Sequence, residues 1–261
     1  LPVLLQWFAE GTDPDAALLA FRRLSEDLGD SHWYLRMLRD SSGAAKRMTQ
    51  VFSTSRLATS LFERMPEAAA WFEREEELLP QKLDQLLGQF QAIISRHEDP
   101  DMAAASIKAI RRKETLRVAI GFVIGSLDLD ASSKGLSDIT EAYLLSMQEL
   151  AIGSMQAKLG NLSQELAIVA MGRFGGAELG FGSDADVMFV YKPTVADVNL
   201  AQSEAAELVS EIRRLCSDQI LEFELDLDLR PEGKNGPIVR SIDSYSSYYQ
   251  RWAGTWESQA L

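Results

Sequence analysis

Two aspartates and a glycine-rich turn offer the chemistry of phosphoryl-type transfer. Asp184 and Asp186 are separated by one residue at the expected start of a strand, and the two-residue period of a strand places both carboxylates on one side. Upstream, Gly175 and Gly176 let the backbone approach a phosphate closely, because they carry no β-carbon and amides in such a turn form an anion-binding nest. Ser183 adds a hydroxyl donor. These residues predict a nucleotide-binding site that holds one or two Mg²⁺ ions.

A third carboxylate is expected from a neighbouring strand. The segment 223–229 alternates strictly, so that Glu224, Asp226 and Asp228 share one face. We choose Asp226 as the third metal ligand and keep Asp228 as the alternative. Several acidic groups on one face of a core sheet would be costly without cations, because like charges resist ionisation when they lie close together. Arg230, just after this strand, is placed to contact a phosphate oxygen.

The combination of these features is more informative than any one of them. A lone Asp-x-Asp sequence is common on protein surfaces, and a glycine-rich turn alone is as typical of a hairpin. The glycine pair, the Ser-Asp-x-Asp sequence and an acidic strand after an intervening helix together predict nucleotidyl transfer from a nucleoside triphosphate. In a two-metal site, one ion would activate the acceptor oxygen and the other would neutralise charge on the leaving pyrophosphate.

Helices are expected to position this site from the N-terminal side. Residues 14–28 have an apolar stripe at helical spacing, with Asp13 as the N-cap and Pro14 at the first helical position. Further helices are predicted over residues 78–95 and 107–127. The chain before the site is therefore expected to be helical.

A small polar segment, residues 130–135, predicts the linker between two domains. We expect a helical domain over residues 1–134 and a second domain over residues 135–261. The missing initiator methionine, and an end at Leu261 that resembles the middle of a helix, indicate a fragment of a longer chain that is truncated at the C-terminus.

The second domain is expected to contain the sheet that carries the aspartates. Runs 166–171 and 187–191 are rich in β-branched and apolar residues and predict two central strands. A helix is predicted over residues 197–220, followed by the acidic strand 223–229. The fold class is α+β, a helical N-terminal domain followed by a domain with a small mixed sheet flanked by helices.

Composition excludes several classes of partner. With 26 basic against 39 acidic residues, the formal net charge is −13, which would repel nucleic acid and favours protein or small-molecule partners. The longest apolar run, residues 118–127, is too short to span a membrane. Cys216 is the only cysteine, a usage typical of a reducing cytoplasm, and we expect it to be buried in a helix.

The segment from Met171 to Phe189, Met-Gly-Arg-Phe-Gly-Gly-Ala-Glu-Leu-Gly-Phe-Gly-Ser-Asp-Ala-Asp-Val-Met-Phe, closely resembles the signature of glutamine-synthetase adenylyltransferases. These enzymes are members of the polymerase-β-like nucleotidyltransferase superfamily. Later blocks agree with that family, including Leu-Arg-Pro-Glu-Gly at residues 229–233 and Thr-Trp-Glu-Ser-Gln-Ala-Leu at residues 255–261. The resemblance covers nearly the whole chain.

The resemblance implies a polymerase-β-like nucleotidyltransferase domain after the helical domain. It makes Asp184 and Asp186 metal ligands and matches Asp226 to the third, although Asp228 stands where the family commonly has arginine, which leaves the register of the third ligand open. It implies ATP as substrate, Mg²⁺ as cofactor and glutamine synthetase as protein partner. It also implies glutamine and a PII-type signal protein as effectors.

The resemblance further implies which reaction is expected. Family enzymes carry two similar halves: one transfers AMP from ATP to a tyrosine of glutamine synthetase, and the other removes AMP by phosphorolysis. The ending at residues 255–261 resembles the C-terminal, adenylylating half. Deadenylylation is the alternative, and a non-catalytic regulatory scaffold is a second one.

Overall fold

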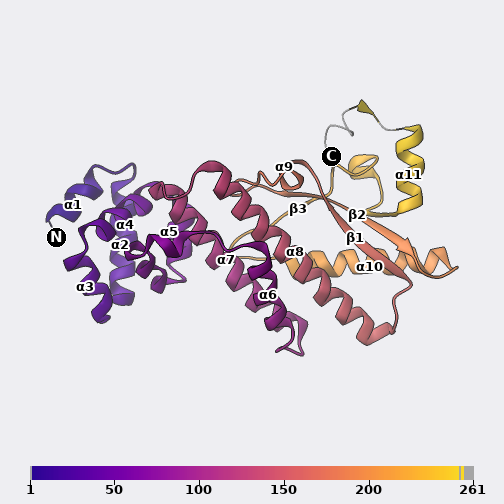
Figure 1. Ribbon diagram of the computed structural model, residues 1–261, viewed down its shortest axis with the longest axis horizontal. Coiled ribbons are helices and arrows are strands. Elements are labelled where there is room, and N and C mark those ends of the chain that lie inside the picture. Colours follow the sequence, from indigo (N-terminus) through magenta and orange to yellow (C-terminus); the bar gives the residue numbers. More distant parts are fainter. Residues whose placement is uncertain (1, 253, 256–261) are drawn as a thin grey trace. The chain divides into compact units, whose positions relative to one another are not determined.

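The computed structural model describes residues 2–252 and 254–255. The chain forms two compact units (Figure 1). The first comprises Leu1–Gln81 with Ile110–Leu136, and the second comprises Lys82–Ala109 with Ser137–Leu261. These units differ from the predicted domains mainly in residues 82–109, which belong to the second unit although they precede residue 134.

Short helices build most of the first unit. At the start of α2 the Asp13 side chain accepts a hydrogen bond from the amide of Ala16 at 3.2 Å, and Pro14 occupies the first turn, so the predicted N-terminus of this helix is confirmed. The helices before residue 80 are α1 (Pro2–Ala9), α2 (Pro14–Leu28), α3 (His32–Asp40), α4 (Ser42–Thr54), α5 (Arg56–Phe62) and two 3₁₀ segments, η1 (Pro66–Glu73) and η2 (Glu75–Leu78).

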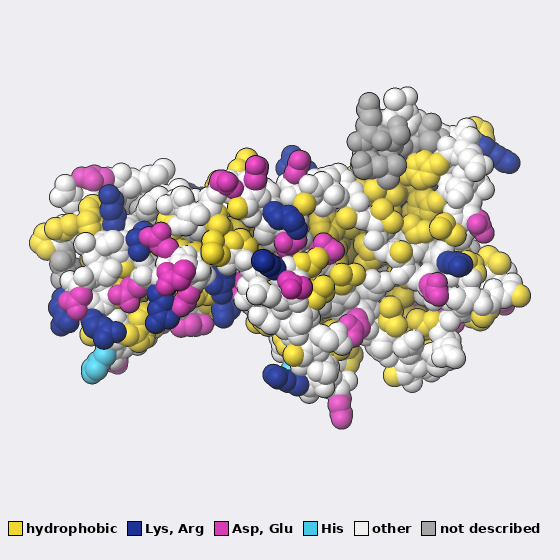
Figure 2. Space-filling view, viewed as in Figure 1, with side chains coloured by type: hydrophobic (Ala, Val, Ile, Leu, Met, Phe, Trp, Pro, Cys, Tyr) yellow, Lys and Arg dark blue, Asp and Glu magenta, His cyan; other side chains and the backbone are white. Residues whose placement is uncertain are grey.

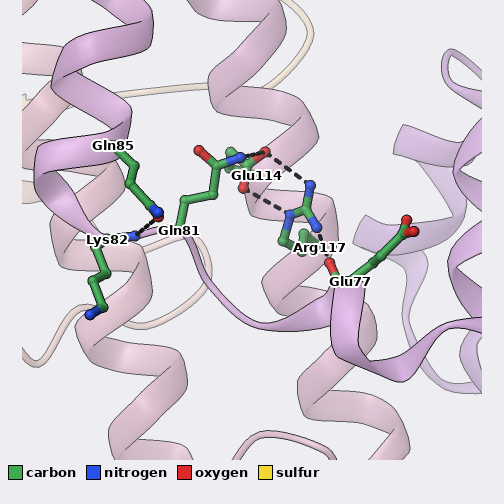
Figure 3. A network of polar contacts seen from close by, with 6 residues as sticks. All are labelled: Glu77, Gln81, Lys82, Gln85, Glu114 and Arg117. Atoms are coloured by element: carbon green, nitrogen blue, oxygen red, sulfur yellow. Dashed lines mark hydrogen bonds and ion pairs between the residues drawn. The ribbon is translucent and has the colours of Figure 1, made fainter.

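A polar network ties the 3₁₀ segments to helix α7 (Pro100–Ile124) within the first unit (Figure 3). The Arg117 guanidinium donates to the buried Glu114 carboxylate at 2.9 Å and to the carbonyl of Glu77. It also lies 4.6 Å from the centre of the Trp71 ring. Gln81 donates to the same Glu114 carboxylate. The buried charge is therefore both paired and hydrogen-bonded, as a buried ion requires.

Residues 130–135 are helical, so the predicted linker is wrong. They lie within α8 (Leu129–Leu159), whose first turn is capped by the Asp128 side chain accepting from the amide of Ala131 at 2.8 Å. Gly135 does not break this helix. A β-carbon there would lie 2.9 Å from the Pro80 side chain, so this glycine permits close packing instead of marking a loop.

The second unit combines helices with one four-stranded sheet. The amide of Lys82 donates to the Gln85 side chain at 3.2 Å at the start of α6 (Figure 3). Its helices are α6 (Leu83–Ile94), residues 100–109 of α7, residues 137–159 of α8, α9 (Gly172–Gly175), α10 (Val198–Cys216), the 3₁₀ turn η3 (Gly233–Asn235) and α11 (Ile242–Arg251). Its strands are β1 (Gln164–Ala170), β2 (Ala185–Pro193), β3 (Leu225–Asp226) and β4 (Val239–Ser241).

Strand β2 is the centre of the sheet. It pairs antiparallel with β1 along its length, from Gln164 opposite Pro193 to Ala170 opposite Val187. It also pairs in parallel with β3 and with β4. The α+β class with a small mixed sheet is thus confirmed. Of the two strands expected to be central, β2 is, whereas β1 pairs only with β2 among the described residues.

Helices pack against this sheet. The apolar stripe of α10, which includes Ala205, Leu208 and Ile212, is buried as predicted, and α10 contacts β1, β2 and β4. Cys216 at its end is also buried. Tyr245 of α11 packs with Met171 and Met188 and donates its hydroxyl to the carbonyl of Phe189 at 3.3 Å.

The surface carries charged side chains of both signs. On the face of the first unit that Figure 2 shows, acidic and basic side chains are interspersed, and the absence of a nucleic-acid partner stays a prediction. Among the described residues, no helix is both long enough and apolar enough to cross a membrane.

Candidate active site

The sheet brings two of the predicted aspartates together. Asp186 is the second residue of β2 and Asp226 the second residue of β3, and the two are register partners in a parallel pair. Their side chains therefore leave the same face of the sheet on adjacent strands. Asp184 lies two residues before Asp186, just outside β2, and is exposed. The predicted convergence of two neighbouring strands is present.

The acidic strand is shorter than predicted, and this separates Asp226 from Asp228. The strand ends at Asp226, because the carboxylate of Asp226 accepts a hydrogen bond from the amide of Asp228 at 2.7 Å, which turns the chain. Asp228 then faces Arg230 at 3.5 Å and Lys234 at 3.2 Å. The expectation of one extended strand over 223–229 is wrong.

The placement of Glu224 also differs from the expected single face. Glu224 precedes β3 and is exposed. Its backbone carbonyl, not its side chain, is engaged with β2 by accepting from the amide of Ala185 at 3.1 Å. Of the three acids considered for the third ligand, Asp226 is the one in register with Asp186.

Electrostatics agree with this arrangement. Partial burial raises the pKa of the Asp186 carboxyl, and the negative charges of Asp226 and Asp184 raise it further, whereas the positive charge of Arg173 opposes the shift. Such mutual repulsion is what a divalent cation would relieve. Among the described residues, no three acidic, histidine or cysteine side chains converge closely enough to hold one metal ion.

Gly172 lies directly against this cluster. Its φ angle is +50°, and a β-carbon at this position would lie 2.6 Å from Oδ2 of Asp186. The amide of Met171 donates to the backbone carbonyl of Asp186 at 2.9 Å. Glycine is therefore required at residue 172 both for the backbone conformation and for the space beside the carboxylate. The sequence pattern alone did not indicate this role of Gly172.

The two glycines expected to hold phosphate have internal partners. The amide of Gly175 donates to the carbonyl of Met171 at 2.8 Å, and that of Gly176 to the carbonyl of Gly172 at 3.0 Å. A β-carbon at Gly175 would lie 2.8 Å from the carbonyl oxygen of Ala170, so this glycine allows α9 to pack against the end of β1. Their contact with phosphate stays a prediction.

Ser183 and Arg230 also have partners within the protein. The Ser183 hydroxyl accepts from the amide of Gly180 at 3.1 Å. Arg230 is buried and donates to three backbone carbonyls within a single loop. These acceptors belong to Leu227 at 2.7 Å, Gly236 at 3.1 Å and Lys234 at 3.2 Å. Arg230 therefore holds the loop after β3, and its contact with phosphate stays a prediction.

A family model described as glutamate-ammonia ligase adenylyltransferase matches residues 45–261. The chain belongs to this family. Two bacterial proteins, both named bifunctional glutamine synthetase adenylyltransferase/adenylyl-removing enzyme, are similar over the whole chain. The protein of Leifsonia xyli is 51% identical over 262 residues and that of Streptomyces coelicolor 40% identical over 280 residues.

The chain is much shorter than these family members. It spans 26% of the length of the Leifsonia protein and 28% of the Streptomyces protein. The closing motif at residues 255–261, which favoured the adenylylating half, lies almost wholly outside the described residues. The assignment of this chain to one half therefore depends on the sequence.

Proposed function

We propose that this chain contains one nucleotidyltransferase active site, which transfers AMP from ATP to a tyrosine of glutamine synthetase and releases pyrophosphate. The observation that carries the proposal is the register of Asp186 with Asp226 on adjacent parallel strands, with Asp184 two residues upstream. Membership of the adenylyltransferase family supports the same chemistry. The names of the relatives supply glutamine synthetase as the protein substrate.

The donor set fits Mg²⁺, which prefers carboxylate oxygens. We propose that Asp184, Asp186 and Asp226 hold two Mg²⁺ ions. Without a cation the three carboxylates repel one another, as the raised pKa of Asp186 indicates. Bound Mg²⁺ would supply activation of the acceptor oxygen and neutralise charge on the leaving group.

The protein's own part in the reaction is to position the reactants. The tyrosine oxygen attacks the α-phosphorus of ATP, a new phosphorus–oxygen bond forms, the bond to the β-phosphate bridging oxygen breaks, and the phenolic proton is released. Gly172 leaves room for the Asp186 carboxylate, which a β-carbon at residue 172 would meet at 2.6 Å, and so allows this carboxylate to be positioned for a bound cation. Gly175, Gly176 and Ser183 remain part of the proposed phosphate-binding turn.

The proposal is tested by incubating the chain with glutamine synthetase, Mg²⁺ and ATP labelled at the α-phosphate. Label should be transferred to tyrosine in the wild-type reaction and not with Asp184→Asn. Adenylylated glutamine synthetase with inorganic phosphate tests the reverse direction. Release of ADP there, without forward transfer, would assign the chain to the deadenylylating activity. No reaction in either direction, with no binding of ATP, would favour the non-catalytic scaffold.

The proposal also covers where the enzyme acts and what regulates it. We place it in the cytoplasm, as a regulator of glutamine synthetase in nitrogen metabolism, with glutamine and a PII-type protein as effectors. Adding each effector to the same forward assay measures its influence. An unchanged rate with both would remove the effectors from the proposal while leaving the transfer reaction intact.

A further inference from the structure

Arg173 is the only basic residue between Gly172 and Asp186. It is the second residue of α9 and is exposed. Among the described residues, its side chain has no hydrogen bond and no ion pair. In this it differs from Arg214, which is paired with Glu211 and Asp101, and from Arg230, which is held by backbone carbonyls.

The backbone fixes Arg173 beside the acidic cluster. A β-carbon on the preceding residue, Gly172, would lie 2.6 Å from Oδ2 of Asp186. The carbonyl of Arg173 accepts from the amide of Glu178 at 2.7 Å, which holds the turn that follows. Arg173, whose guanidinium has no partner among the described residues, is thus held next to Gly172 and the proposed site.

Two basic residues that follow β3 are already engaged. Arg230 is directed into its own loop, and Lys234 is paired with Asp228. The β- and γ-phosphates of a nucleoside triphosphate would add negative charge to that of its α-phosphate. A planar guanidinium can donate two parallel hydrogen bonds to phosphate oxygens, which an ammonium cannot.

We propose that Arg173 binds the β- or γ-phosphate of the nucleoside triphosphate. This inference rests on the proposed function, because it assigns a residue to the triphosphate of that same site. Arg173 then takes the phosphate-binding role that the sequence had suggested for Arg230. Its unpaired guanidinium is available to the triphosphate, whereas that of Arg230 is used by the fold.

The test compares binding of Mg·ATP and of AMP to the whole chain by calorimetry. Arg173→Ala should weaken Mg·ATP binding by about 10- to 100-fold, with AMP binding changed much less, because AMP lacks the β- and γ-phosphates. Arg173→Lys should restore part of the loss, because it keeps the charge but not the paired donors. Arg213→Ala, which removes an exposed arginine from α10, should bind Mg·ATP as the wild type does.

Each outcome has a separate meaning. Wild-type affinity of Arg173→Ala for Mg·ATP, or an equal loss for ATP and AMP, would overturn the role of Arg173. A wild-type chain that binds Mg·ATP but transfers no AMP to glutamine synthetase would overturn the proposed function and leave the role of Arg173 standing. A wild-type chain that binds no Mg·ATP would overturn both.

Discussion

Asp186 on β2 and Asp226 on β3 are register partners, so two carboxylates lie beside each other on neighbouring parallel strands. The pairing is unfavourable by itself, because the negative charge of Asp226 opposes ionisation of Asp186. The short strand β3 contributes two residues to the sheet, and one of them is this aspartate. The two carboxylates therefore repel each other at the place where the proposed function requires a cation.

Replacing Asp226 and Asp228 one at a time should show which of the two is the third metal ligand. Asp226→Asn removes the register partner of Asp186 and should lower AMP transfer by about 1,000-fold. Asp228→Asn is the matched control, since Asp228 is already paired with Arg230 and Lys234, and it should retain most of the activity. Initial rates with labelled ATP measure both. The reverse order of the two losses would make Asp228 the third ligand.

The stability of the metal-free protein should depend on pH through Asp186. Its pKa is raised in the folded protein, so its contribution to stability is fully present below the unfolded pKa and is lost as pH rises through the folded pKa. Asp186→Asn should therefore melt at a higher temperature than the wild type at pH 7 in EDTA. The difference should shrink as the pH falls towards 4. Thermal melts of both proteins across this range measure it, and an advantage that grew on acidification would contradict the assignment.

Gly172→Ala should lower the transfer activity by more than strain at a positive φ angle alone would. The new β-carbon would meet the Asp186 carboxylate at 2.6 Å, and the residue would keep a positive φ angle, which costs about 1–2 kcal/mol for an L-residue. Gly160→Ala is the control, because Gly160 also has a positive φ but has open space around it. Both variants should lose stability in urea unfolding. Only Gly172→Ala should also lose most of the transfer activity.

Arg230→Ala should destabilise the fold. Its guanidinium satisfies three backbone carbonyls in a buried loop, and leaving them unpaired should cost about 2–4 kcal/mol. Arg230→Lys should rescue little of this, because one ammonium cannot reproduce the planar donor set. Denaturant unfolding measures the loss. Unchanged stability combined with weaker ATP binding would return Arg230 to the phosphate-binding role that the sequence first suggested.

Local signals in the sequence predicted many of the elements. The N-cap at Asp13, the stripe of α10 and the strand that carries Asp186 follow from spacing and residue type, and each is present. Predictions were wrong where the structure depends on contacts between residues that are distant in the sequence. Gly135 resembled a linker residue because the sequence cannot show that Pro80 packs against it.

The acidic segment illustrates the same limit at the site. Alternation over residues 223–229 suggested one long strand, but the Asp226 carboxylate accepts the Asp228 amide and ends the strand. The inward direction of Arg230 also depends on carbonyls that only the folded loop brings together. The short signature at residues 172–186 predicted where the candidate site lies, whereas the contacts of each charged residue could be seen only from its neighbours in space.

The pairing of β2 also has a consequence for how the protein folds. Strands β1 and β2 are close in sequence and form a local antiparallel pair, whereas α10 lies between β2 and its parallel partners β3 and β4 in the chain. Closing the longer loop costs more entropy and slows folding. We expect the antiparallel pair to form early and the contact between Asp186 and Asp226 to form late. During folding, the glycine-rich turn with Asp184 and Asp186 would then be in place before Asp226 pairs with Asp186.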